Sequence, residues 1–423
     1  MHVSSYWAAT SGEQPKREHL EGKIEADVAI IGAGFTGLSA AYHLQKLGYK
    51  TVVLEEHCVG WGASGRNGSL MLIGYKHNLY TLAKKYGFET TKDMLKMSLD
   101  GIDLVKDIAE KHNISCEFIN NGSLVAAYKP SHLDDLKKEQ EFMMNKLGYL
   151  NYIVEKEEVS GEIHSPLYHG GMVDPNSCYI HPLQYAIGLA DAVESVGGKI
   201  FERSRVTSIT RQNNEVVLKT EKGEVCAKQL ISATNGYTQE VTQKLARSVM
   251  PVGSYIVTTE SLGENFSRKL IPKNRGVFDT KNFLYYFRMT TDHRLLFGGR
   301  VHFLAKESDG LYQELRENML NVFPELKDAK IDYKWGGNVA LTFDLLPHIG
   351  QMEDGTYFAL GYSGHGVSLS TLLGKLLAQK INKQEEGNSV LEKFPLRQIP
   401  MHGQRALVLN LVGSYFKFMD WVS

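Results

Sequence analysis

The three glycines of residues 32–37 have the spacing of a phosphate-binding turn. The segment GAGFTG follows an apolar, β-branched run at 27–31 and precedes residues with helical spacing. In such a turn the first glycine permits the tight bend, the second lets the backbone approach a pyrophosphate, and the third lets helix and strand pack closely. Glu55 lies 23 residues after Gly32, where a carboxylate can accept hydrogen bonds from ribose hydroxyls. The pattern predicts a nucleotide site; the alternative is a turn that only closes a strand–helix corner.

A second polar, glycine-rich stretch, GWGASGRNGS at 60–69, bears on the choice between NAD and FAD. It follows Glu55 shortly and carries Ser64, Arg66 and Asn67. Both cofactors use the first turn, but a second polar loop suits a longer cofactor that lies across the domain. FAD is therefore the predicted ligand. A surface loop is the alternative, and Trp61 is equally compatible with a core aromatic residue.

A third glycine-rich turn lies near the other end of the chain. FALGYSGHGVSLS at 358–370 reads as a strand, a loop with Gly361, Gly364 and Gly366, and the start of a helix over 366–380. The free N–H groups and the positive dipole end of that helix favour a negative charge. A flavin acquires such a charge at N1 and the C2 oxygen when it takes up a hydride. We therefore expect one turn to hold the pyrophosphate and the other to hold the redox end of the same molecule; a helix start against a crowded interface is the alternative.

The composition excludes several classes of protein. The chain has 423 residues, 43% of them hydrophobic, which is enough for a large core and two domains. Its 47 Lys and Arg nearly balance 48 Asp and Glu, so no nucleic-acid surface is expected. No apolar run is long enough for a bilayer, and the N-terminus lacks the apolar core of a signal peptide. Four scattered cysteines without a CxxC pair argue against zinc and disulfides, so we expect no metal site and a reducing cytoplasm.

Hydrophobic periodicity predicts a mixture of helices and sheets. The residues at 205–234 alternate and turn twice, which is typical of antiparallel hairpins. After Met250, β-branched and aromatic runs separated by polar turns predict strands of an antiparallel sheet. Helices are expected at 78–112, 131–147, the first part of 181–201 and about 308–323.

The order of these elements predicts an α/β domain combined with an α+β domain. Residues 1–75, 170–245 and 335–423 would form a discontinuous, Rossmann-like FAD-binding domain. Residues 76–169 and 246–334 would form a substrate-binding domain on a mostly antiparallel sheet.

Six motifs in order resemble one known family. They are GAGFTGLSAAYHL with VVLEE, GWGASGRNGS, HPLQYAIGLADA, ISATNGYT, YYFRMTTDHRLLFGGR, and LLPHIG with FALGYSGHGVSLS. Together they resemble the flavin-dependent amine oxidoreductases of the D-amino acid oxidase and sarcosine oxidase superfamily, and most of all its γ-glutamylputrescine oxidase branch. The resemblance covers about 5–415 and implies a D-amino acid oxidase-like fold with an FAD-binding domain and a substrate domain.

The resemblance also implies a set of FAD contacts. Val206 is expected to use its backbone near the adenine, and residues 363–367 to cap the pyrimidine end of the flavin ring. The cofactor-binding residues implied are Gly32, Gly34, Phe35, Thr36, Gly37, Glu55, Glu56, Gly62, Ala63, Ser64, Arg66, Asn67, Gly68, Val206, Ala233, Thr234, Gly236, Gly361, Gly364, His365, Gly366 and Val367.

Three departures from the sarcosine oxidases matter. Ser368 stands where they carry a carboxylate-binding lysine, SLMLIG has no match to their arginine, and WGGNVALT lacks the cysteine that bonds their flavin. Sarcosine is therefore not the expected substrate, and the FAD is expected to be noncovalent.

Amine oxidation by a flavin needs little acid–base machinery. The lone pair of a neutral amine stabilises the carbon from which a hydride leaves for flavin N5, so the protein must bind the amine neutral, orient its C–H bond and exclude water. Tyr286 and Arg288 share one face of a predicted strand, and Arg300 follows two glycines on the next. These residues and His348 are the candidates for positioning the substrate; structural roles are the alternative for both arginines and for His348. His181 is expected to be structural.

The predicted function is oxidation of a C–N bond in a γ-glutamylated or otherwise acylated amine, or in a secondary amino acid. The alternatives are a dehydrogenase that passes electrons to a quinone or carrier instead of O2, a noncatalytic flavin-binding module, and an NAD dehydrogenase. The stretch at 405–423 is apolar enough to contact a membrane surface or a partner, although such a tail more often packs on its own protein.

Overall fold

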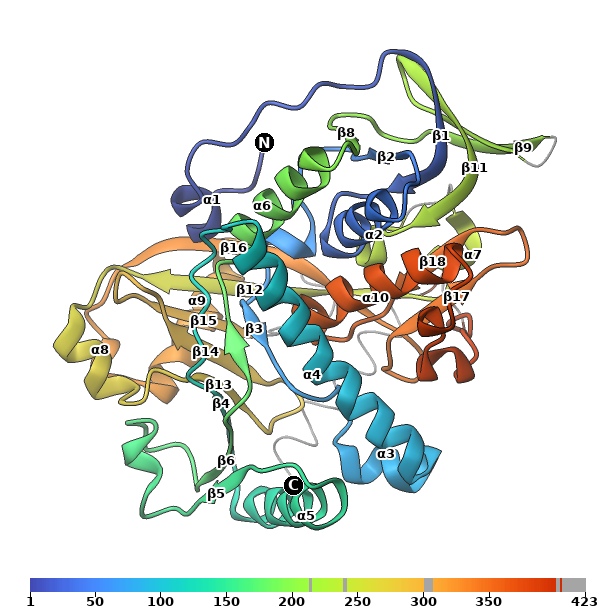
Figure 1. Ribbon diagram of the computed structural model, residues 1–423. Helices are drawn as coiled ribbons and strands as arrows, with labels where there is room; N and C mark the ends of the chain where they lie inside the picture. Colours follow the sequence, from blue (N-terminus) through green and yellow to red (C-terminus); the bar gives the residue numbers. More distant parts are fainter. Residues whose placement is uncertain (213–214, 239–241, 300–306, 401–403, 405–423) are drawn as a thin grey trace.

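Two sheets of eight strands organise the chain. The computed structural model describes residues 1–423 except 213–214, 239–241, 300–306, 401–403 and 405–423 (Figure 1). The first sheet has the order β17-β18-β11-β1-β2-β8, and β10 and β9 extend from β11. Its strands are β1 (Gly22–Ile31), β2 (Thr51–Leu54), β8 (Lys199–Phe201), β9 (Ser208–Gln212), β10 (Glu215–Lys219), β11 (Gly223–Ser232), β17 (His348–Gln351) and β18 (Tyr357–Leu360).

The central strands of this sheet are parallel and covered on both faces. β1 pairs in parallel with β2 and β11. Val28 and Ile30 pack with the helices α2 (Phe35–Lys46), α6 (Pro182–Ser195) and α10 (Gly366–Ile381), whereas Ala29 belongs to the cluster on the other face (Figure 1). Burial on both faces explains why residues 27–31 read as a continuous apolar run and not as an alternation.

The second sheet is mostly antiparallel, as expected. Its order is β16-β12-β15-β14-β13-β4-β6-β5, and β13 with β4 is its parallel pair. A separate hydrophobic core joins it to α9 (Asp309–Val322). Its strands are β4 (Ser123–Ala126), β5 (Tyr152–Val154), β6 (Gly171–Asp174), β12 (Met250–Thr259), β13 (Gly276–Asp279), β14 (Tyr285–Met289), β15 (Leu295–Gly299) and β16 (Ile331–Leu341).

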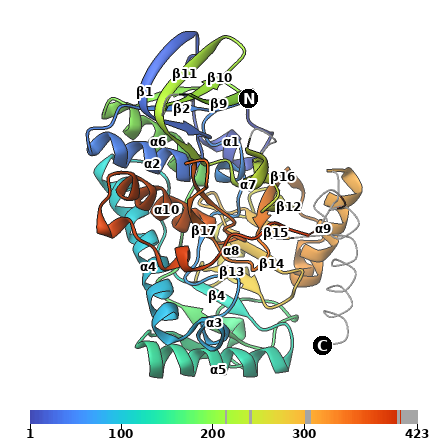
Figure 2. The same ribbon diagram turned by 90° about the vertical axis from the view of Figure 1, so that its right-hand side faces the viewer.

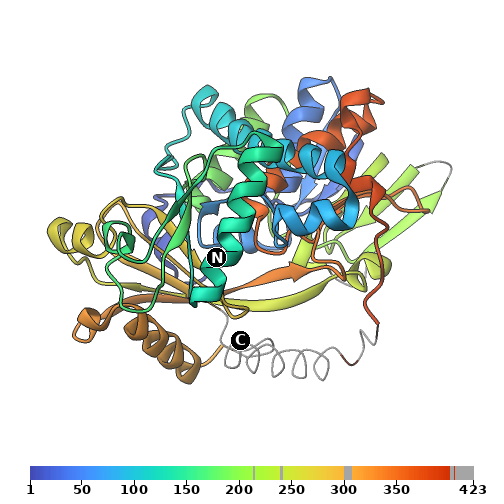
Figure 3. The ribbon, with the colours of Figure 1, turned by 90° about the horizontal axis from the view of Figure 1, so that it is seen from below.

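The two sheets draw on segments that alternate along the chain. Figure 2 shows α2, α6 and β9–β11 at one end of the molecule and α3 (Leu79–Tyr86) and α5 (Pro130–Leu147) at the other. Seen from below, α9 lies on the opposite side of the molecule from α2 and α10 (Figure 3). Two boundaries of the predicted FAD-binding domain, at residues 170 and 335, differ from the observed sheets. Residues 171–174 form β6 and residue 335 lies in β16, and both strands belong to the second sheet.

One local prediction needs correction, and a second is confirmed but incomplete. The single helix expected at 78–112 is two helices, α3 and α4 (Phe88–Lys111), because Gly87 between them has φ 90°. The hairpins expected at 205–234 are present, but β11 also pairs in parallel with β1, a partner that local alternation cannot reveal. The remaining helices lie close to their predicted ranges.

The sequence predicts no membrane-spanning helix, no disulfide and no metal site. None of their helices has both the length and the apolar character required to cross a membrane. The four cysteines are buried and unbonded to one another, and the described part of the chain holds no group of three or more His, Cys, Asp or Glu side chains arranged for a metal ion. The apolar tail at 405–423 lies outside the described residues.

Helices α2 and α10 come from opposite ends of the chain and cross in close contact. Thr36 Oγ1 lies 2.6 Å from the Tyr362 hydroxyl, and Ser39 donates to the Thr371 carbonyl at 2.6 Å. A Cβ at Gly374 would lie 2.5 Å from the Thr36 carbonyl oxygen. The crossing therefore requires a glycine on α10, at the point where the middle of α10 meets the first turns of α2.

We predict that Gly374→Ala lowers the free energy of unfolding by about 1–3 kcal/mol, because the added methyl group meets backbone atoms that cannot move independently. Gly310→Ala is the matched control, since Gly310 is helical and a Cβ there meets nothing within 4 Å; it should raise stability by about 0.5–1 kcal/mol. Urea and thermal unfolding measure both. If Gly374→Ala were as stable as the wild-type protein, α2 and α10 would not be in such close contact.

Candidate functional site

One cavity of about 870 Å³ joins the two glycine-rich helix starts. Residues from the turn before α2 and residues 363–367 before α10 both line it. The second sheet contributes Tyr286 and Asn338 to the same wall. The volume is within the range of cavities that hold cofactors and small substrates. Segments more than 300 residues apart in sequence thus line one cavity.

The first turn has the close contacts that its glycines predict. Gly32 has φ 101°, and a Cβ at Gly37 would lie 2.0 Å from the Gly32 carbonyl oxygen. Gly34 is the N-cap of α2 and offers no side chain as a cap, while the next residue, Phe35, donates its N–H to Ser64 Oγ at 3.0 Å. The first turn of α2 therefore opens toward the cavity with its N–H groups and its positive dipole end.

Glu55 is held in place by backbone donors at the edge of this turn. Its two carboxylate oxygens accept from the N–H groups of Ala33 and His57, each at 2.9 Å. Burial raises the pKa of Glu55 to about 6, although both hydrogen bonds favour the ionised form. Because a carboxylate oxygen can accept more than one hydrogen bond, Glu55 keeps acceptor capacity for hydroxyl groups in the cavity.

The second turn is built around the start of α10. Gly361 and Gly364 have φ of 81° and 105°, and Gly361 donates its N–H to Asn235 Oδ1 at 2.9 Å. His365 is the N-cap of α10 and makes no side-chain cap hydrogen bond. Burial, with a smaller effect of Lys76, lowers the pKa of His365 to about 3, so the ring is neutral at physiological pH.

Residues 61–69, which we call the cofactor loop, form the wall between the two turns. The Arg66 guanidinium lies 4.0 Å from the Trp61 ring centroid, and its Nε donates to the Trp61 carbonyl at 2.7 Å. Asn67 fixes the loop from within: its amide donates to Ala63 O and Ser64 O, both at 3.0 Å. Trp61 lines the cavity and is not a core residue.

Two polar atoms on the cavity wall have no partner in the described chain. They are Arg66 Nη2 and His365 Nδ1, and both are buried. Unpaired buried polar atoms are costly, so these two atoms indicate that the wall is completed by a polar ligand. They belong to the cofactor loop and the α10 turn respectively, as expected for one ligand that contacts both.

The structure brings together most of the predicted cofactor residues. Three do not line the cavity: Gly37 packs on Gly32, Gly236 faces Ala340, and Gly361 faces Thr342. The residues that line it are Gly32, Gly34, Phe35, Thr36, Glu55, Glu56, Gly62, Ala63, Ser64, Arg66, Asn67, Gly68, Val206, Ala233, Thr234, Gly364, His365, Gly366 and Val367.

Of the predicted substrate residues, Tyr286 lines the cavity and its hydroxyl lies 3.0 Å from Ser254 Oγ. Arg288 and His348 have other partners and do not line it. Arg288 is fully buried and donates to Ser69 Oγ at 2.5 Å. Arg300 lies outside the described residues.

His348 is a core residue tied to two neighbouring segments. One ring nitrogen lies 3.0 Å from the Asp344 carboxylate and the other lies 3.2 Å from the Phe394 carbonyl oxygen. Because each nitrogen already has a partner, we do not retain His348 as a substrate-positioning residue.

Several lining residues carried no signal in the sequence. Ser254 and Asn338 belong to strands β12 and β16, where small and polar residues also occur for packing reasons. Met172 and Glu139 come from β6 and α5, whose patterns are those of an ordinary strand and an ordinary amphipathic helix. Only the pairing of distant segments places them together.

Comparison with known proteins identifies the class of cofactor. A family model described as FAD dependent oxidoreductase matches residues 27–380. The chain is 36% identical to γ-glutamylputrescine oxidoreductase of Escherichia coli over 423 residues, covering 99% of this chain and 98% of that protein. It is 35% identical to a probable oxidoreductase, OrdL, of Haemophilus influenzae over 99% of this chain and 97% of that one. The crystal structure of glycine oxidase from Geobacillus kaustophilus superposes with a TM-score of 0.74 at 22% identity, covering 89% of this chain and 99% of that one.

The cavity fits FAD. The two helix N-termini suit negatively charged groups, Glu55 suits ribose hydroxyls, and the unpaired atoms of Arg66 and His365 suit polar ring atoms. Within the described residues no cysteine lines the cavity, in agreement with noncovalent binding.

We predict that FAD binding weakens as the pH falls through about 6, the pKa of Glu55. Above this pH the carboxylate accepts hydrogen bonds from hydroxyl groups, and protonation removes part of that capacity. The dissociation constant, measured by flavin fluorescence between pH 5 and 8, should rise by up to roughly 10-fold toward pH 5. Glu55→Gln should bind more weakly at pH 8 and show a flatter profile. A constant wild-type affinity over this range would refute the role of Glu55.

Proposed function

Because the chain belongs to the family of FAD-dependent oxidoreductases, we propose that it oxidises a C–N bond of an amine or amino acid to an imine. Bound FAD supplies the chemistry by accepting a hydride at N5. The observation that carries the proposal is the single cavity, which is lined by the starts of two helices and by a separate wall from the second sheet.

The chain's own residues supply charge stabilisation on the cofactor side. The N-terminus of α10 directs its positive dipole end at the cavity beside His365. Since His365 is neutral, it adds no competing positive charge and offers one nitrogen as donor and the other as acceptor. The dipole therefore favours negative charge that develops at this end of the cavity during reduction.

The second sheet supplies the substrate side. Tyr286 packs closely over the cofactor loop, because a Cβ at Gly68 would lie 2.4 Å from its ring. Its hydroxyl and Ser254 provide polar atoms, and Val125 and Met172 provide apolar surface. Such a wall can orient an amine and exclude water, and low polarity lowers the pKa of a bound amine so that it is held neutral.

The shape of the cavity supports an extended substrate. Beyond Tyr286 it continues toward α5, where the buried carboxylates Glu139, Asp174 and Asp279 line it. All three accept hydrogen bonds from backbone N–H groups, and the charge of Lys281 favours the ionised form of Asp279. A substrate with a second polar or cationic group would suit this region better than glycine or sarcosine. A γ-glutamylated amine has this form, in keeping with the name of the Escherichia coli relative.

The function is tested by mixing the anaerobic holoprotein with a panel of amines and recording flavin absorbance near 450 nm, roughly where oxidised flavins absorb. We expect γ-glutamylputrescine or another acylated diamine to bleach the flavin faster than putrescine, glycine or sarcosine, and air to restore the colour if O2 is the acceptor. Restoration only by an added quinone would assign a carrier as acceptor. Absence of bleaching with every amine would refute the proposed function.

Tyr286→Phe is expected to lower kcat/KM for the accepted amine roughly 5- to 100-fold, because a polar contact on the substrate wall is lost. The FAD dissociation constant should stay unchanged, since the aromatic ring against Gly68 is retained. Stopped-flow reduction and fluorescence titration separate the two quantities. A variant that reduces its flavin at the wild-type rate would exclude Tyr286 from substrate binding.

A further inference from the structure

We propose that the N-terminal helix α1 (Tyr6–Thr10) positions the FAD site through Trp7, although it does not line the cavity. This inference depends on FAD binding and not on the substrate proposed above. Trp7 is a positioning residue, because it acts through the backbone of the cofactor loop.

Two indole groups hold adjacent carbonyls of that loop. Trp7 Nε1 donates to the Asn67 carbonyl and Trp335 Nε1 donates to the Arg66 carbonyl, each at 2.9 Å. Both side chains are fully buried, and their rings meet edge to face with centroids 6.3 Å apart. The two donors therefore fix two consecutive peptide groups, Arg66–Asn67 and Asn67–Gly68, on either side of the Asn67 Cα.

Arg288 adds a third contact at the end of the loop. Its Nε donates to Ser69 Oγ, and Ser69 has φ 73°, a left-handed conformation that a serine adopts only when neighbouring contacts impose it. The guanidinium lies 5.3 Å from the Trp7 ring centroid and 4.4 Å from that of Tyr179. The described chain places no carboxylate within ion-pair distance of Arg288, so aromatic faces stabilise its charge.

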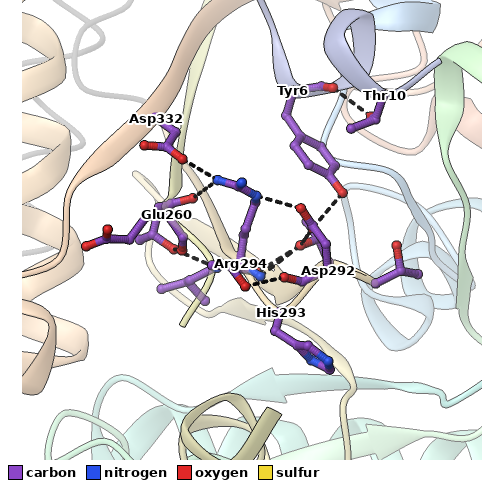
Figure 4. Close-up of polar contacts among 12 residues, drawn as sticks. Tyr6, Thr10, Glu260, Asp292, His293, Arg294 and Asp332 are labelled. Carbon is purple, nitrogen blue, oxygen red and sulfur yellow. Dashed lines mark hydrogen bonds and ion pairs between the residues drawn. The ribbon is translucent and has the colours of Figure 1, made fainter. Parts of the chain in front are cut away.

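The helix is anchored at two further points. Figure 4 shows that the Tyr6 hydroxyl donates to Asp292, at 2.8 Å, and that Asp292 also pairs with Arg294. On the other side, Thr10 Oγ1 lies 2.9 Å from a ring nitrogen of His181, the N-cap of α6. Helix α1 therefore connects the turn between β14 and β15 to α6, which packs on the first sheet. Trp7 contacts the cofactor loop between these two anchors.

These contacts lie behind the loop atoms that face the cavity. The held carbonyls belong to Arg66 and Asn67, two of the loop residues that line the cavity, and Arg66 also carries the unpaired Nη2. Loss of one indole N–H leaves a buried carbonyl unpaired, which the loop can relieve only by moving. The cost should therefore appear in FAD affinity as well as in stability.

Trp7→Phe tests this inference, because it removes the N–H group and retains an aromatic ring. We expect the FAD dissociation constant to rise roughly 10-fold and the increase in Tm caused by FAD to shrink. Tyr6→Phe is the matched control on the same helix, since it removes the Asp292 contact and leaves Trp7 in place. It should lower Tm and leave the dissociation constant unchanged. If Trp7→Phe lowered Tm equally with and without FAD, and its affinity for FAD were unchanged, the proposal would be overturned.

Hydrogen exchange of the wild-type protein provides a second test that needs no variant. Adding FAD to the apoprotein should slow exchange in residues 6–10 as well as in 61–69, although α1 does not line the cavity. Slower exchange confined to the cofactor loop and the glycine turns would show that α1 is not coupled to the site.

Discussion

The convergence of two helix N-termini on one cavity is the constraint on which the rest of the structure depends. α2 begins beside Gly34 and α10 begins at Gly366, and the helices touch through Gly374. Bringing two positive dipole ends together is unfavourable unless negative charge lies between them. FAD carries a pyrophosphate and a ring that becomes anionic on reduction, so one ligand can satisfy both ends. The first sheet supports this arrangement because β1 pairs with β11 from the middle of the chain, and β11 pairs in turn with β18 from near its end.

The cofactor loop connects this helix pair to the second sheet. Ser64 contacts the first turn of α2, Arg66 and Asn67 receive the two indoles, and Gly68 lies under Tyr286. One short segment therefore contacts both the first turn of α2 and the Tyr286 wall of the second sheet. That segment is held from outside by buried side chains, an arrangement that favours a pre-organised site.

Gly32, Gly34 and Glu55, which the sequence proposes as cofactor residues, line one cavity because they lie within one strand–helix–strand unit. The mostly antiparallel second sheet is visible in the sequence as runs of β-branched and aromatic residues. The start of α10 was also predictable, because the strand, glycine turn and helix follow one another in the sequence. The proximity of α10 to α2 was predictable only from the argument that one flavin cofactor has two ends that suit helix N-termini.

The substrate side was harder because it depends on partners that are distant in the chain. Arg288 and Tyr286 share one face of a strand, but only Tyr286 lines the cavity. Arg288 instead contacts Ser69 and two aromatic rings. His348 resembles a site residue until Asp344 and Phe394 are seen to occupy both of its nitrogens.

The crystal structure of the protein with FAD is the most direct test of the account. We predict that one FAD molecule extends from residues 32–36 to residues 363–367. An FAD whose ring lies away from the start of α10 would contradict the central claim.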